Sequence, residues 1–169
     1  GPRAEARLTA RRDKVPNWYL DVSLLNRYWG SDRVYHHTAP VNMNFGMREA
    51  LRLLAEEGLE QAWARHRRNA EALWAGLERL GLVLHAPEAL RLPTLTTVRI
   101  PEGVDGKAFS QHLLNHHGIE VGGGLGTLAG KIWRIGLMGY NSNPENVDRL
   151  LNLFETELPR FKSIAVAAA

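Results

Sequence analysis

An arginine among apolar residues, shortly after a run of glycines, is the feature of this sequence best suited to chemistry. Residues 122–126 read Gly-Gly-Gly-Leu-Gly, and the apolar segment 131–138 that follows carries Arg134. Glycine has no Cβ atom, so its backbone can come close to another group. A guanidinium that loses water needs acceptors, and its planar fork matches a carboxylate with two hydrogen bonds. The pattern fits two interpretations equally: a small anion, such as a carboxylate, held by Arg134 beside the glycines, or an ion pair from Arg134 to a protein Asp or Glu beside a loop that merely turns.

A second polar group lies at residues 35–40, which read Tyr-His-His-Thr-Ala-Pro and precede a predicted helix. The hydroxyls of Tyr35 and Thr38 could both donate to a phosphate. The residues alone favour a local turn or helix cap made by Thr38, with the neighbouring aromatic rings filling the core.

Metal, serine and dinucleotide chemistry find less support. His112 and His116 are spaced to share one helix face and could bind zinc, but the chain has no cysteine and offers no obvious third ligand. We therefore predict no metal site. His66 is predicted to be a hydrogen-bonded core histidine. The serine-nucleophile elbow is missing, and the glycine run does not fit the dinucleotide fingerprint.

The elements that position Arg134 follow from periodicity. Alternation in residues 132–138 predicts a strand with Arg134 on one face and Trp133, Ile135 and Leu137 on the other. Other strands are expected at residues 82–84, 94–100 and 119–121, and helices at 41–57, 59–80, 106–116 and from Asn143-Pro144 onward. This order predicts an α+β fold: a small open, at least partly antiparallel sheet with helices on one face.

Residues 1–40 are predicted to be the end of a larger domain, because they offer two short helical stretches and no strand. Residues 41–169 are predicted to form a small domain. The stripe that includes Met43 and Met47, and the one that includes Leu59 and Trp63, are interpreted as core. The uncharged tail, residues 164–169, is expected to be loose.

Composition narrows the functional classes. The chain has 169 residues, and no apolar run approaches the roughly 18 residues of a membrane helix. Residues 1–14 carry a net charge of +3, which equals that of the whole chain, so we expect no nucleic-acid partner. Without a signal-peptide pattern or a C-terminal Ser-Lys-Leu, we expect a cytoplasmic protein.

Several motifs together resemble the alanine–glyoxylate and serine–pyruvate (serine–glyoxylate) aminotransferases. The likeness runs in one register from about residue 3 to about residue 161, and its motifs lie at residues 35–40, 48–51, 56–59, 65–67, 92–94, 122–126, 130–131 and 133–139. The resemblance implies a pyridoxal 5'-phosphate enzyme of the aspartate-aminotransferase-like fold, a homodimer with sites at the subunit boundary.

The resemblance also implies roles for single residues. Arg134 would grip the α-carboxylate of the amino-acid or keto-acid substrate, and Gly124, with the rest of the glycine segment, would line the substrate side. Tyr35 and Thr38 would reach across the dimer to the cofactor phosphate of the neighbouring subunit.

The family's Schiff-base lysine lies upstream of the region that this chain matches, as do the aspartate for the pyridine nitrogen and the main phosphate loop. None of the four lysines matches that catalytic position: Lys14, Lys107, Lys131 and Lys162. We therefore expect the C-terminal part of an aminotransferase that moves an amino group from alanine or serine to glyoxylate or pyruvate. It would need the enzyme's N-terminal half and be inactive alone. The alternative is a non-catalytic small-ligand-binding or dimerisation domain.

Overall fold

The computed structural model describes residues 1–162, and its backbone contacts divide the chain into two compact units. One spans Gly1–Arg52 and the other begins at Leu53. The assignment of residues 1–40 to the end of a larger domain stays a prediction, as does the looseness of the tail, which lies outside the described residues.

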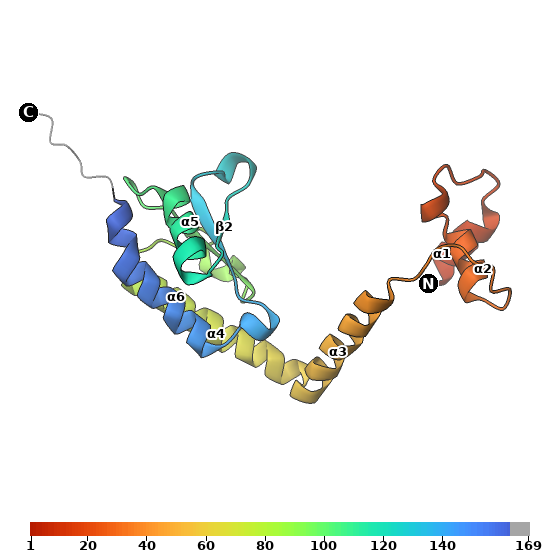
Figure 1. Cartoon of the computed structure of the whole chain (residues 1–169), viewed down its shortest axis with the longest axis horizontal. Helices are drawn as coiled ribbons and strands as arrows, with labels where there is room; N and C mark the ends of the chain where they lie inside the picture. Colours follow the sequence, from red (N-terminus) through yellow and green to blue (C-terminus); the bar gives the residue numbers. More distant parts are fainter. Residues whose placement is uncertain (163–169) are drawn as a thin grey trace, which may run out of the picture. The chain divides into compact units, whose positions relative to one another are not determined.

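A three-stranded antiparallel sheet is the centre of the second unit. Its strands are β1 (Leu95–Arg99), β2 (Gly122–Gly123) and β3 (Ile132–Gly136), in the order β1-β3-β2. Three helices complete the unit: α4 (Leu59–Arg79), α5 (Gly106–His117) and α6 (Pro144–Glu157). The helices α4 and α6 pack against each other along their length (Figure 1). Short 3-10 turns lie at Glu88–Leu90, Gly126–Leu128, Gly139–Asn141 and Leu158–Phe161.

One face of the sheet meets the helices, as the alternation predicts. Trp133, Ile135 and Leu137 are all buried. The ring of Trp133 packs edge-on against Phe109 of α5 and Phe154 of α6. Its indole N–H donates to the Gly106 carbonyl at 3.0 Å, so the one polar atom of this side chain is satisfied in the core. The predicted α+β arrangement is confirmed.

Local capping explains where the helices beside the sheet begin and end. Asp105 accepts a hydrogen bond from the Ala108 N–H and starts α5, which ends at Gly118 in the left-handed conformation. Asn143 caps α6 by accepting from the Asn146 N–H, and proline fills the first helical position. The apolar side of α6 is buried at Val147, Leu150, Leu153 and Phe154.

Two segments that were predicted to be strands do not form strands. Residues 82–84 form only the isolated bridge between Leu84 and Val98 of β1. Residues 119–121 form no strand, because the Ile119 N–H closes the end of α5 by donating to the Leu113 carbonyl. The chain pairs with β3 only from Gly122, so the glycine run itself supplies β2.

The first unit contains α1 (Pro2–Ala10), the 3-10 turn Trp18–Leu20 and α2 (Val22–Trp29). The helix α3 (Val41–Glu57) follows and crosses the boundary between the units. None of the described helices has the length and apolarity to cross a membrane.

The interpretation of the apolar stripe on α3 as core is wrong: α3 buries no residue, and Met43 and Met47 are exposed. The stripe on α4 is confirmed as core over most of its length, since Ala70, Leu73 and Leu77 are fully buried. Only its first turn departs from this, because Leu59 and Trp63 are exposed. Periodicity shows which face of a helix is apolar, but it does not show what covers that face.

Candidate functional site

Arg134 lies on the face of the sheet that the helices leave uncovered. Paired residues of neighbouring strands share a face, and Arg134 pairs with Thr97 of β1 and with Gly122 of β2. The guanidinium Nε–H donates to the Gly123 carbonyl at 2.7 Å. This bond holds the side chain along the glycine strand.

No carboxylate of the described residues neutralises Arg134. Three arginines in residues 1–162 are partly buried, and two of them have acidic partners: Arg65 pairs with Glu57, and Arg91 with Glu78. Within residues 1–162, the Arg134 side chain makes only the hydrogen bond to Gly123. The internal ion pair that the sequence left open is therefore absent from this part of the chain, and the charge of Arg134 remains available to an anion.

The glycines near Arg134 differ in how much space a side chain would have at each position. A Cβ atom on Gly122 would lie 3.4 Å from a terminal nitrogen of Arg134, in ordinary contact. A Cβ atom on Gly124 would lie only 2.0 Å from the Leu128 carbonyl oxygen. The close approach at Gly124 is thus to the chain's own loop, and a role of Gly124 in lining the substrate side stays a prediction.

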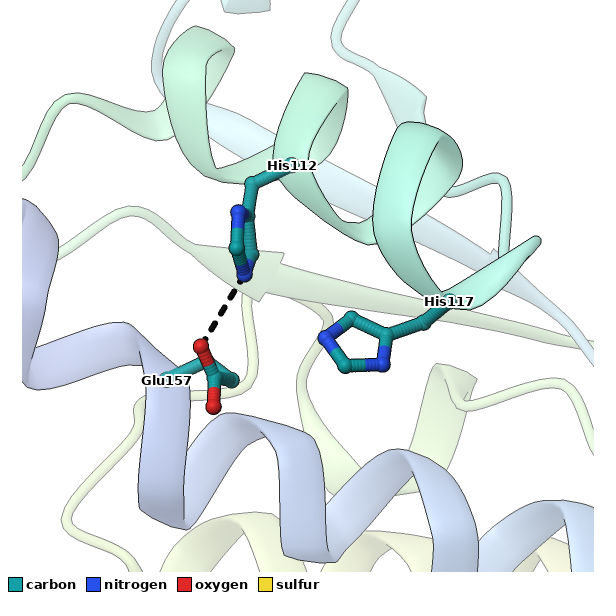
Figure 2. Close-up of side chains that lie close together, drawn as sticks. All are labelled: His112, His117 and Glu157. Atoms are coloured by element: carbon teal, nitrogen blue, oxygen red, sulfur yellow. Dashed lines mark hydrogen bonds and ion pairs between the residues drawn. The ribbon is translucent and has the colours of Figure 1, made fainter.

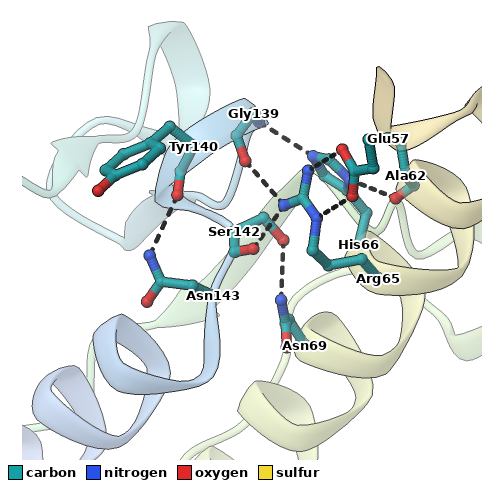
Figure 3. Close-up of polar contacts among 9 residues, drawn as sticks. All are labelled: Glu57, Ala62, Arg65, His66, Asn69, Gly139, Tyr140, Ser142 and Asn143. Carbon is teal, nitrogen blue, oxygen red and sulfur yellow. Dashed lines mark hydrogen bonds and ion pairs between the residues drawn. The ribbon is translucent and has the colours of Figure 1, made fainter. Parts of the chain in front are cut away.

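The segment that follows β3 is fastened to α4 (Figure 3). Arg65 donates from Nη1 to the Gly139 carbonyl at 2.9 Å and to the Ser142 carbonyl at 2.6 Å. Asn69 donates to the fully buried hydroxyl of Ser142. Each of these bonds links residues more than seventy positions apart, which is why periodicity within a single element did not reveal them.

His66 belongs to the same network and has both ring nitrogens bonded to backbone. Its Nε2 accepts from the Gly139 N–H at 3.0 Å, so the proton sits on Nδ1, which donates to the Ala62 carbonyl at 2.6 Å. The histidine is half-buried and hydrogen-bonded. It fixes the turn after β3.

Glu57 holds Arg65 in place for this task. Arg65 donates to both carboxylate oxygens of Glu57, once from Nε and once from Nη2, the latter at 2.8 Å. The hydrogen bonds from Arg65 lower the pKa of Glu57 below the ordinary glutamate value, against a smaller opposing effect of burial. The carboxylate is therefore the favoured form at neutral pH.

In the first unit, Tyr35 and Thr38 are brought together. Their hydroxyl oxygens are 2.8 Å apart, and the Tyr35 side chain is exposed. His36 is instead buried: its ring stacks on Trp18, and its Nε2 lies 2.9 Å from the Trp18 carbonyl oxygen. The imidazole of His36 thus fills the local core, while the hydroxyls of Tyr35 and Thr38 lie at the surface. Two such hydroxyls could donate hydrogen bonds to the oxygens of a phosphate.

The two glycines give a matched test of this geometry. We expect Gly124→Ala to lower the unfolding free energy by about 1–3 kcal/mol, because the new Cβ atom collides with backbone. Gly122→Ala should change it by less than about 1 kcal/mol, since the contact with Arg134 is ordinary. Urea denaturation followed by circular dichroism measures both, and equal effects would contradict the described loop.

The ion pair between Glu57 and Arg65 gives a pH test. A lowered carboxyl pKa stabilises the fold above the unfolded value, 4.5 for glutamate, and this contribution is lost as the pH falls through the lowered pKa. We expect Glu57→Gln to reduce the unfolding free energy at pH 7 and to have no effect well below pH 4. The control is Glu102→Gln, at an exposed turn residue without an ion pair in the described chain, and it should change the unfolding free energy at pH 7 less than Glu57→Gln does. A pH-independent loss in Glu57→Gln would contradict the assignment.

Comparison with known proteins identifies the family. A family model described as aminotransferase class-V matches residues 19–150. An alanine–glyoxylate aminotransferase of Oryctolagus cuniculus is 47% identical over 152 residues, which cover 88% of this chain and 39% of the relative.

Solved structures agree with this match. The crystal structure of an alanine–glyoxylate aminotransferase from Nostoc sp. has 61% identity and a TM-score of 0.85, covering 92% of this chain and 41% of that chain. The structure of a ureidoglycine–glyoxylate aminotransferase from Bacillus subtilis has 39% identity and a TM-score of 0.90, covering 98% of this chain and 43% of that one. The chain thus spans about two fifths of the length of these relatives. The expected family and the aspartate-aminotransferase-like fold are confirmed, and the chain belongs to the aminotransferase class-V family.

Proposed function

We propose that this chain is the part of a pyridoxal 5'-phosphate-dependent aminotransferase that holds the substrate carboxylate. The amino group would move from alanine or serine to glyoxylate or pyruvate. The observation that carries the proposal is the state of Arg134: it is partly buried, it lies on the open face of the sheet, and it has no acidic partner among residues 1–162.

The geometry of Arg134 suits a small carboxylic acid. Its Nε is occupied by the Gly123 carbonyl, which leaves both terminal nitrogens for the two oxygens of one carboxylate. Gly122, next to the guanidinium, offers no side chain that would compete for the space. Alanine, serine, glyoxylate and pyruvate all carry the carboxylate that such a grip recognises.

The names of the relatives support glyoxylate as the amino acceptor. The rabbit and Nostoc proteins are named for alanine and glyoxylate, and the Bacillus subtilis protein for ureidoglycine and glyoxylate. Glyoxylate is common to all three, whereas the amino donor differs. We infer that this chain's carboxylate grip serves the shared acceptor and that the donor is selected elsewhere in the complete enzyme.

The cofactor's phosphate would be held by the hydroxyls of Tyr35 and Thr38. Both are within reach of one acceptor, since their oxygens are 2.8 Å apart, and each can turn its proton outward. Pyridoxal phosphate, when bound, supplies the electron sink that transamination requires. The lysine that moves protons would come from the part of the enzyme that extends beyond this chain in its relatives.

An N-terminal half and a second subunit are the proposed partners. The exposed apolar side chains of α3 support this, because Met43, Met47 and Leu51 follow one face of the helix and present an apolar surface that the described residues do not cover. A similar apolar surface lies in the first unit at Trp18, Tyr19 and Leu20.

A chimaeric enzyme tests the role of Arg134. We expect this chain, joined to the upstream part of the Nostoc enzyme, to catalyse transfer from alanine to glyoxylate, and the 169-residue chain alone to be inactive with added cofactor. Arg134→Gln should lower kcat/KM by about a hundredfold or more, because two charge-assisted hydrogen bonds are lost. Pyruvate formation is the measurement.

Arg99→Gln is the matched control, since this exposed arginine lies on the same face of β1. Its kcat/KM should equal that of the unsubstituted chimaera. The proposal fails if Arg134→Gln and Arg99→Gln have the same activity, or if the isolated chain transaminates.

The hydroxyl pair is tested separately by cofactor affinity in the same chimaera. Tyr35→Phe and Thr38→Ala should each weaken pyridoxal phosphate binding by about fivefold to tenfold, the effect of one hydrogen bond. Absorbance titration of the apoenzyme measures this. Tyr19→Phe, at another exposed tyrosine of the first unit, is the control and should bind as tightly as the parent. Unchanged affinity in both hydroxyl variants would refute the assignment.

A further inference from the structure

Two histidines and a glutamate come together where α5 and α6 end (Figure 2). The Nε2 atom of His112 lies 3.0 Å from an oxygen of Glu157, and His117 projects from the last residue of α5 toward this pair. One ligand atom from each of the three side chains lies within 4.8 Å of the other two. Such a grouping occurs nowhere else among residues 1–162.

The chemistry of this group suits a transition metal. Two imidazoles and one carboxylate are ligands that zinc accepts, with a water in the fourth position. Bonds of about 2.0–2.2 Å in tetrahedral geometry place ligand atoms roughly 3.3 Å apart. The separation of His112 and Glu157 is already close to this, so a small rotation of His117 would complete three sides of a site.

The state of His117 is a second observation that points to a ligand. Its ring faces the pair formed by His112 and Glu157, but neither of its nitrogens makes a hydrogen bond among the described residues. The side chain is partly buried, as are those of the other two residues.

We propose that His112, His117 and Glu157 bind a divalent transition metal of the Zn²⁺ type. The metal would replace the proton that links His112 to Glu157 and would tie the ends of α5 and α6 together. The site is independent of Arg134, which lies on the open face of the sheet, and the proposal does not rest on transaminase activity.

Two neighbours define the site's limits. His116 is spaced for the same helix face as His112, but its ring stacks on that of His112, and it is not one of the three side chains whose ligand atoms gather within 4.8 Å. Arg160 donates to the Glu157 oxygen at 2.7 Å and competes with the metal. Its side chain is 66% exposed, so it can move into water when a metal binds.

Zinc titration of the tag-free, chelator-treated 169-residue chain tests the proposal. We expect one equivalent of Zn²⁺ to bind by calorimetry with micromolar affinity, and to raise the unfolding temperature. His117→Gln and Glu157→Gln should each weaken the affinity for Zn²⁺ more than about tenfold, because a site with three protein ligands loses most of its metal affinity when one ligand is removed. His116→Gln is the matched control and should bind zinc as the wild type does.

Arg160→Ala extends the test without touching a ligand. It should bind zinc severalfold more tightly than wild type, because a competing cation is removed from Glu157. Equal or weaker affinity in this variant would contradict Glu157 as the third ligand. The proposal is also overturned if wild type binds no zinc at about 100 µM, or if His117→Gln binds it as tightly as wild type does.

Discussion

The alternation of side chains along β3 is the constraint on which the site depends. The ring of Trp133 is locked in the core between Phe109 and Phe154, so the next residue, Arg134, must face the other way. A slip of one residue would bury a guanidinium and expose the indole, which the register with β1 forbids. Core packing thus presents a charge on the open face. Arg65 is an arginine in the opposite situation to Arg134. Its charge is neutralised by Glu57, and its guanidinium fastens the turn after β3.

The sequence predicted the parts of the fold that depend on neighbours along the chain. The helix starts at residue 106 and at Asn143-Pro144 and the alternation in β3 follow from single residues and short periods, and all three are confirmed. Pairing between strands is non-local, and a local pattern does not show where pairing begins. The strand predicted at residues 119–121 is therefore wrong, and the glycine run pairs with β3 instead. The interpretation of the α3 stripe as core is wrong because amphipathicity shows which face of a helix is apolar but not what covers that face.

The candidate site divides along the same line. The assignment of Arg134 to a substrate carboxylate is a prediction from residue type and surroundings, and the structure adds that no described carboxylate neutralises it. The contacts of Arg65 and Asn69 with a turn more than seventy residues away were missed, because residue type and spacing do not report them. The contact between His112 and Glu157, forty-five positions apart, was missed for the same reason. Residue type and spacing therefore supplied the candidates, while contacts between distant elements required the structure.

A crystal structure of the complete enzyme with a bound keto acid tests the central claim most directly. The account predicts both oxygens of the ligand's carboxylate within about 3 Å of the terminal nitrogens of Arg134, with Nε still donating to the Gly123 carbonyl. An aspartate or glutamate of the protein in that position, with the keto acid bound elsewhere, would contradict it.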